Sequence, residues 1–256
     1  LTQITIPSSV QLIENSIFSE CSSLIQISIP SSVKSIGNHA FYGIKSLNIE
    51  GTIQNIYDNM FKECSTLTQI KIPSSVTSIG DCAFYGCSSL KQISIPSSVK
   101  SIGYHTFYGI KSLNLEGTIH NIYDNMFKEC STLTQITIPS SVTKIGNNAF
   151  YGCSSLTQIT IPSSVISIGN DVFQGCSSLK QLTIPSSVTS VGDSAFYKCS
   201  SLTQITIQSS LESIGKFTFM ECSSLIQITI PSSVISIGNY AFLRCSKLTQ
   251  ITIPSS

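Results

Sequence analysis

Residues 67–87 read LTQIKIPSSVTSIGDCAFYGC, and close copies of this stretch follow one another along the whole chain of 256 residues. The Leu or Ile that opens each copy returns after 23 residues nine times and after 20 residues twice. One such unit cannot bury its own apolar side, so neighbouring units must stack. The period therefore predicts a single repeat solenoid over residues 1–256, with eleven complete units and a partial one.

Each unit contains the same succession of signals. Residues 67–72 alternate apolar with polar side chains, and this period of two predicts a β-strand. Pro73 ends the strand because proline lacks a ladder N–H. Gly80 then permits a sharp bend, and Asp81 is placed to cap a short helix that carries Phe84. We expect an α/β solenoid with parallel strands on one face, short helices on the other and a spine of phenylalanines inside.

Nine of the ten cysteines fall in one column, between the Phe and the next Leu of each of the nine 23-residue units. A strict position of this kind predicts a buried thiol that packs as a small apolar side chain. Disulfides between neighbouring units are the alternative that the cysteine count leaves open. Paired ligands of the type that zinc sites use are missing from the pattern, so we expect no metal and no cofactor.

Composition excludes several classes of function. Only 11% of the residues are charged and the net charge is +1, which argues against nucleic-acid binding. The chain has no run of about 18 apolar residues, so we expect no membrane span.

Catalysis is also disfavoured. His39, His105 and His120 lie in no Ser-His-Asp arrangement, and there is no phosphate-binding glycine loop. Glu50 and Glu116 replace the usual proline, but they stand three units apart, about 14 Å at the spacing of strands in a sheet. That is too far for shared acid–base work, so we interpret them as altered turns copied with their units and expect no enzyme activity.

The consensus Leu-x-x-Ile-x-Ile-Pro-x-x-Val-x-x-Ile-Gly-x-x-Ala-Phe-x-x-Cys, complete in residues 67–87, resembles the BspA-like leucine-rich repeats. The resemblance extends over the whole chain. It implies a cell-surface or secreted protein, of bacteria or protozoan parasites, that binds host matrix proteins or neighbouring cells. A cytoplasmic location is the alternative left open.

The outward strand positions are the place to expect a ligand, because the inward ones are committed to packing. One outward column is Gln and the next is Thr or Ser, and these side chains could simply hydrogen-bond to their own copies. Departures from the pattern concentrate in residues 44–66 and 110–132, where they form a mixed-sign patch or merely a solvated edge. The candidate binding residues are Lys45, Asn48, Gln69, Lys71, Lys111, Asn114 and Gln135.

These observations predict a non-enzymatic adhesion module that binds a protein or a glycan on its outward strand face. A structural, self-assembling scaffold and an intracellular recruitment scaffold are the alternatives. Neither end of the sequence carries a polar capping unit, which predicts a fragment of a longer protein whose open ends can associate end to end.

Overall fold

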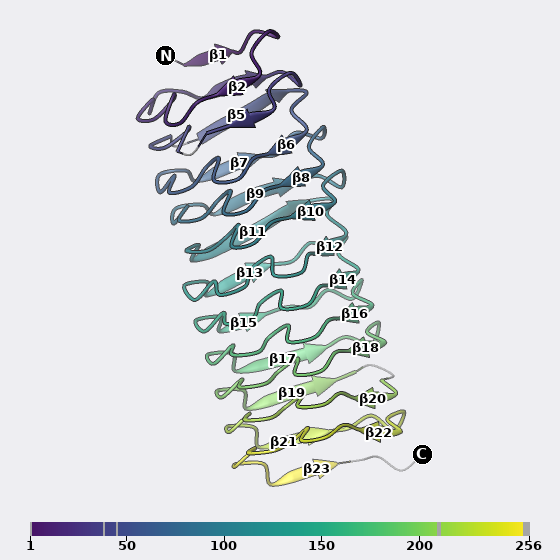
Figure 1. Cartoon of the computed structure of the whole chain (residues 1–256). Helices are drawn as coiled ribbons and strands as arrows, with labels where there is room; N and C mark the ends of the chain where they lie inside the picture. Colours follow the sequence, from purple (N-terminus) through teal and green to yellow (C-terminus); the bar gives the residue numbers. More distant parts are fainter. Residues whose placement is uncertain (1, 38, 45, 209–210, 253–256) are drawn as a thin grey trace. The chain divides into compact units, whose positions relative to one another are not determined.

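The computed structural model describes residues 2–37, 39–44, 46–208 and 211–252; of Ser46, Glu50 and Gly51 only the backbone is described. The chain divides into two compact units, an N-terminal unit of residues 1–119 and a C-terminal unit of residues 120–256. Each unit is a parallel β-solenoid of the leucine-rich repeat type (Figure 1). The expectation of a single domain over the whole chain stays a prediction.

The N-terminal unit has two columns of parallel strands (Figure 1). The long strands follow one another in the order β1 (Gln3–Thr5), β3 (Gln26–Ile29), β5 (Ser46–Gly51), β7 (Gln69–Lys71), β9 (Gln92–Ile95) and β11 (Ser112–Gly117). The short strands are β2 (Leu12–Ile13), β4 (Ser35–Ile36), β6 (Asn55–Ile56), β8 (Ser78–Ile79) and β10 (Ser101–Ile102).

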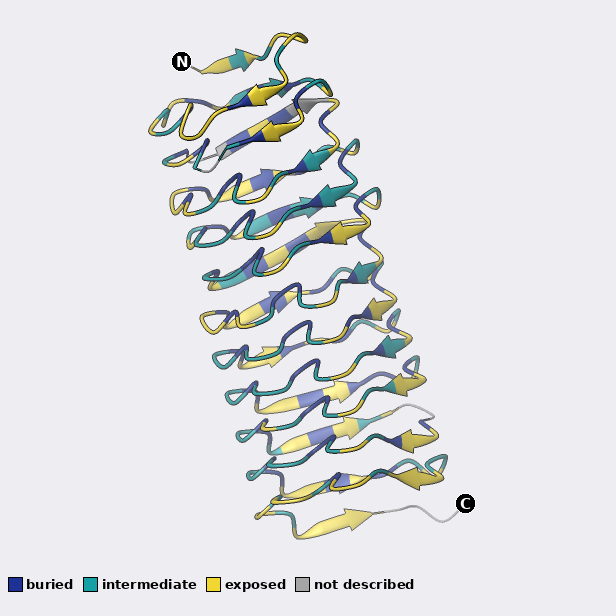
Figure 2. Ribbon diagram, viewed as in Figure 1, coloured by how far each residue is buried: buried dark blue, intermediate teal, exposed yellow. Residues whose placement is uncertain are grey.

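The C-terminal unit repeats this arrangement. Its long strands are β13 (Gln135–Thr137), β15 (Gln158–Ile159), β17 (Gln181–Ile184), β19 (Gln204–Ile207), β21 (Gln227–Thr229) and β23 (Gln250–Thr252). Its short strands are β12 (Asn121–Ile122), β14 (Lys144–Ile145), β16 (Ser167–Ile168), β18 (Ser190–Val191), β20 (Ser213–Ile214) and β22 (Ser236–Ile237). As the period of two predicts, alternate residues of the long strands are buried, which gives the striped strands of Figure 2.

The third side of each turn corrects the sequence prediction, because the described residues contain no helix. The segment expected to be helical is a series of turns whose N–H groups donate to the neighbouring repeat. Phe61 N donates to Ala83 O at 2.9 Å and Glu63 N to Tyr85 O at 2.6 Å. Two residues in each of these segments have left-handed backbone, as Cys82 (φ 54°) and Gly86 (φ 73°) do. A right-handed helix cannot continue through such residues, so the prediction of short helices is wrong.

Asp81 does not cap a helix either. Its Oδ1 accepts a hydrogen bond from the backbone N of Tyr104, one repeat further on, at 2.7 Å, just as Asp58 Oδ1 accepts from Asp81 N at 2.8 Å. The Asn and Asp column is therefore a ladder between repeats. Gly80 has no left-handed backbone; a Cβ there would meet the side chain of Asp58 and its backbone N. Close stacking of turns, rather than a sharp bend, requires this glycine.

The expected phenylalanine spine is confirmed in both units. Phe61 and Phe84 stack with ring centroids 5.2 Å apart in the N-terminal unit, and Phe150 and Phe173 stack at 5.5 Å in the C-terminal unit. These rings are at most 1% exposed. Stacking supplies the interior that no single repeat could form.

The cysteine column lies beside this spine. All ten cysteines, each in the described part of the chain, are thiols. Cys87 Sγ donates to Phe61 O at 3.0 Å and Cys199 Sγ to Phe173 O at 3.1 Å, so these thiols also link repeats. Burial raises the pKa of the Cys64 and Cys199 thiols to about 12. These cysteines are therefore protonated and structural at neutral pH.

Candidate ligand-binding surface

The long strands of the N-terminal unit do not align as the repeats align in the sequence. The repeat pattern places Ser46 beside Gln26, whereas the structure pairs Gln26 with Asn48, two residues further on. The same step occurs where β9 pairs Gln92 with Asn114 of β11. Each step comes directly after one of the two 20-residue units, which are three residues shorter than the others. A step of two residues compensates for most of this shortening, and because it is an even number each side chain stays on the same face of the sheet.

These steps explain the two residues that replace proline. β5 and β11, each six residues long, continue past the usual end of the strand. Glu50 pairs with Ser28 and Glu116 with Ser94 inside the ladder, where a proline would lack the N–H. The interpretation of Glu50 and Glu116 as altered turns is therefore wrong. The side chain of Glu116 instead joins the outward face of the strands.

The stepped sheet brings outward side chains of five strands into two rows. One row runs Gln26, Asn48, Lys71, Ser94 and Glu116 on neighbouring strands. The adjacent row runs Gln69, Gln92 and Asn114. Polar groups of four chemical types, an amide, a hydroxyl, an ammonium and a carboxylate, thus lie on one surface.

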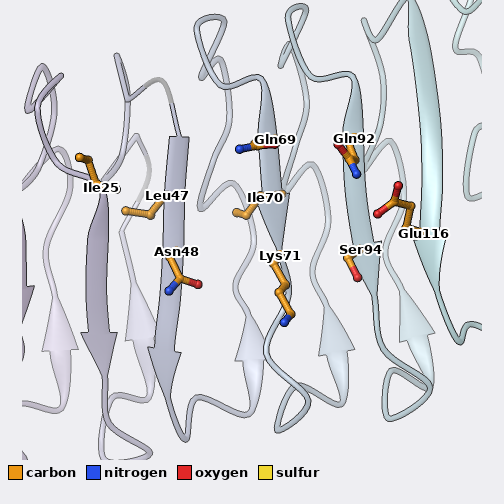
Figure 3. Close-up of a pocket in the computed structure, with 9 residues that line it drawn as sticks. All are labelled: Ile25, Leu47, Asn48, Gln69, Ile70, Lys71, Gln92, Ser94 and Glu116. Carbon is orange, nitrogen blue, oxygen red and sulfur yellow. The ribbon is translucent and has the colours of Figure 1, made fainter.

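A depression of about 520 Å³ lies over these rows. We call it the N-terminal depression; it is lined by Ile25, Leu47, Asn48, Gln69, Ile70, Lys71, Gln92, Ser94 and Glu116. Figure 3 shows Ile25 at one end, Glu116 at the other and Lys71 between them. The side chain of Ile25 is 57% exposed, so the end away from the carboxylate is apolar.

The charged groups of the depression are available to a ligand. Lys71 forms no ion pair or hydrogen bond with the described residues, and neither do the side chains of Gln69 and Gln92. Glu116 is held in place by Asn114, whose Nδ2 donates to Glu116 Oε1 at 3.0 Å. Lys71 and Glu116 stand two strand spacings apart, about 9.6 Å along their row.

The predicted binding residues are thus partly brought together. Asn48, Gln69 and Lys71 line the N-terminal depression, and Asn114 positions Glu116 within it. The remaining three are Lys111, exposed just before β11; Gln135, exposed on β13 of the C-terminal unit; and Lys45, which is outside the described residues.

Sequence reasoning missed Ile25, Gln92 and Ser94 and set Glu116 aside. A signal was present, since residues 24–89 and 90–155 differ at nine of 66 positions. Two of the nine substitutions are exposed on the strand face, Ile25 to Lys91 and Lys71 to Thr137. Both Ile25 and Lys71 line the depression. The duplicated blocks therefore diverged on this face at the positions that give the depression its chemistry.

The C-terminal unit has a depression of similar size and different chemistry. It measures about 480 Å³ and its polar lining is Gln158, Thr160, Ser163, Gln181, Thr183, Gln204, Thr206 and Gln208. No charged side chain lines it. We call it the C-terminal depression; it lies on the same kind of strand face and has no counterpart of Lys71 and Glu116 in its lining.

The predicted ladder of like side chains is confirmed at one place on the strand face, where Gln3 Nε2 donates to Gln26 Oε1 at 2.7 Å. The histidines lie away from both depressions. His39 and His105 contact the edges of Tyr42 and Tyr108, with ring centroids 6.3 and 6.2 Å apart. Within the described ranges, no three His, Cys, Asp or Glu side chains are close enough to hold a metal ion, and there is no helix suited to crossing a membrane.

Stacked parallel strands, a repeated Leu and Ile interior and a repeat of 20 to 23 residues define a leucine-rich repeat protein. The sequence profile described as the BspA type leucine rich repeat region, with six copies, matches residues 1–113, 54–179 and 143–256. The chain therefore belongs to the BspA-type leucine-rich repeat family. Proteins of this family are generally non-enzymatic modules that bind other proteins, and they are typically surface or secreted proteins.

Solved structures agree with this assignment. A leucine-rich repeat protein from Bacteroides ovatus is 27% identical, with a TM-score of 0.62, over 96% of this chain and 73% of its own. A leucine-rich repeat protein from Eubacterium ventriosum is 25% identical, with a TM-score of 0.53, over 99% of this chain and 73% of its own. No curated protein matches the chain in sequence.

Proposed function

We propose that the chain is an adhesion module of a cell-surface or secreted protein, and that the N-terminal depression is where it binds its ligand. The observation that carries the proposal is the row in which Lys71 and Glu116, the two charged residues that line the depression, flank Ser94. Neither charge is needed for packing, since both side chains are exposed.

The surrounding side chains support the same conclusion. Gln69 and Gln92 carry both donors and acceptors that the described part of the chain leaves unused. A ligand that hydrogen-bonds to these amides displaces their water without leaving a buried polar group unsatisfied. Several such contacts along a strand face add up to specific binding although each is weak.

The test is saturable binding of the 256-residue chain to immobilised matrix proteins and to a panel of glycans. We expect the double change Gln69→Glu and Lys71→Glu to lower affinity at least tenfold, because it reverses the charge at the centre of the depression. Thr183→Glu introduces a charge at an exposed position of the C-terminal depression and is the matched control. Equal loss in both variants, or in neither, would contradict the assignment of this depression.

The alternative of a self-assembling scaffold has its own measurement. Sedimentation velocity over a hundredfold range of concentration distinguishes the two functions, because a ligand-binding module need not change its mass with concentration.

A further inference from the structure

The spacing of the charges in the N-terminal depression restricts what can bind there. Lys71 and Glu116 belong to the same row, with one strand between them, so their backbones are about 9.6 Å apart. Ile25 is exposed beside β3, two strands beyond Lys71 on the other side. A ligand that uses all three must present a basic, an acidic and an apolar group in this order, at nearly equal intervals.

We infer that the occupant is a peptide in the polyproline II conformation, with basic, acidic and apolar side chains at every third residue. Polyproline II has three residues per turn and rises about 3.1 Å per residue, so residues i and i+3 face one side about 9.3 Å apart. This interval agrees with two strand spacings. The inference rests on the proposed function, since it names the ligand class of the same depression.

Other chain conformations fit less well. An extended β-strand repeats its face every second residue, about 6.7 Å, which is out of step with the two charges. An α-helix offers residues i and i+7 about 10.5 Å apart, but its backbone groups are bonded internally. The side-chain amides of Gln69 and Gln92 would then have no backbone to bind. A neutral glycan would bring no opposite charge to Lys71 or to Glu116.

The amides of the depression suit a polyproline II backbone. Such a chain has no internal hydrogen bonds, so its carbonyl groups point outward and need donors. Gln69 and Gln92 each bring an NH₂ group from neighbouring strands in the row beside Lys71. The peptide backbone thus pairs with the amide row while its side chains meet the charged row. A pre-extended chain also loses little conformational entropy on binding.

Fluorescence anisotropy with labelled peptides tests the inference on the whole chain. The probe has the sequence KPPEPPL, a second peptide EPPKPPL exchanges the charges, and a third, KPEPL, shortens the interval. We expect the probe to bind at least tenfold more tightly than either of the others at low ionic strength, and added salt to weaken it. Equal affinity for the three peptides would overturn the inference.

A charge exchange in the protein provides the second arm. The double variant Lys71→Glu and Glu116→Lys should prefer EPPKPPL over KPPEPPL, and Thr183→Glu should leave the original preference unchanged. A double variant that is folded by circular dichroism and does not invert the preference overturns the inference, and so does a helical peptide with charges seven residues apart that binds better than KPPEPPL.

The outcome also separates this inference from the proposed function. If a folded matrix protein or a glycan binds in a Lys71-dependent manner while no polyproline II peptide does, the peptide inference fails and the binding depression stands. If no ligand of any class responds to Lys71→Glu, both fail.

Discussion

The N-terminal and C-terminal depressions lie on the same kind of strand face, yet only one of them carries charge. In the N-terminal depression Lys71, Ser94 and Glu116 succeed one another on β7, β9 and β11. The C-terminal depression offers threonines at the comparable outward positions, among them Thr183 and Thr206, which pair on β17 and β19. Repetition therefore builds both surfaces, and a few departures from it place the charges of the N-terminal depression.

The largest expected loss of stability should be the same in both units, because each interior contains the same stack of phenylalanines. We expect Phe84→Ala and Phe173→Ala each to lower the free energy of unfolding by about 3–5 kcal/mol, since both rings are fully buried and stacked. Chemical denaturation followed by circular dichroism measures this, with Gln69→Ala as an exposed control. A loss confined to one unit would show that the two interiors are not equivalent.

The buried thiols should make both units sensitive to alkali. An unfolded thiol ionises near pH 8.5, whereas burial raises the pKa of Cys64 and Cys199 to about 12. Above pH 9 the unfolded state therefore loses the proton first, and the free energy of unfolding falls by about 1.4 kcal/mol per pH unit for each thiol.

Urea titrations at pH 8, 9.5 and 10.5 check this effect. Cys64→Ala and Cys199→Ala should each make the free energy of unfolding decrease less steeply with pH, by the contribution of one thiol. Comparison with the unchanged chain removes the contribution of tyrosines and lysines. Identical pH dependence in the variants and in the unchanged chain would contradict it.

Moving the two charges to the strand face of the C-terminal unit tests directly whether they account for the difference between the two depressions. Thr183 and Thr229 stand on β17 and β21, with β19 between them, as Lys71 and Glu116 stand around β9. In a Lys71→Glu background, Thr183→Lys with Thr229→Glu should restore binding of the KPPEPPL peptide by about tenfold, or 1.4 kcal/mol. Anisotropy measures it, and the reversed pair Thr183→Glu with Thr229→Lys is the control that should not bind.

The smallest effect concerns the ladder of Asn and Asp side chains. Asp58→Ala and Asn170→Ala remove the acceptors of the Asp81 and Asp193 backbone N–H groups, at 2.8 and 2.9 Å. We expect each change to cost about 1 kcal/mol, as the loss of a capping side chain does, and to speed exchange of the released amide. Asp58→Asn keeps an acceptor and should stay close to the original stability; a cost equal to that of Asp58→Ala would argue against the hydrogen bond as the cause.

Parts of the candidate surface could be predicted and parts could not. Asn48, Gln69 and Lys71 could be predicted because the alternation of the strand turns their columns outward. Gln69 follows the pattern of its column, and Asn48 and Lys71 depart from theirs. Glu116 was not, because its place in the row depends on the two-residue step between β9 and β11. That step arises from the hydrogen bonding of neighbouring strands, which the alignment of repeats does not contain.

Repetition along the sequence predicts that the chain forms a stack, because columns of Leu, Ile, Phe and Cys can be buried only by their own copies. The lack of helix on the third side of each described turn emerged only from the three-dimensional structure. The left-handed positions hold residues as different as Cys82, Ser194 and Phe217, so local propensity does not reveal them. Their conformation follows from hydrogen bonds to the next repeat, and the same contacts between repeats set the register that brings Lys71 and Glu116 into one row.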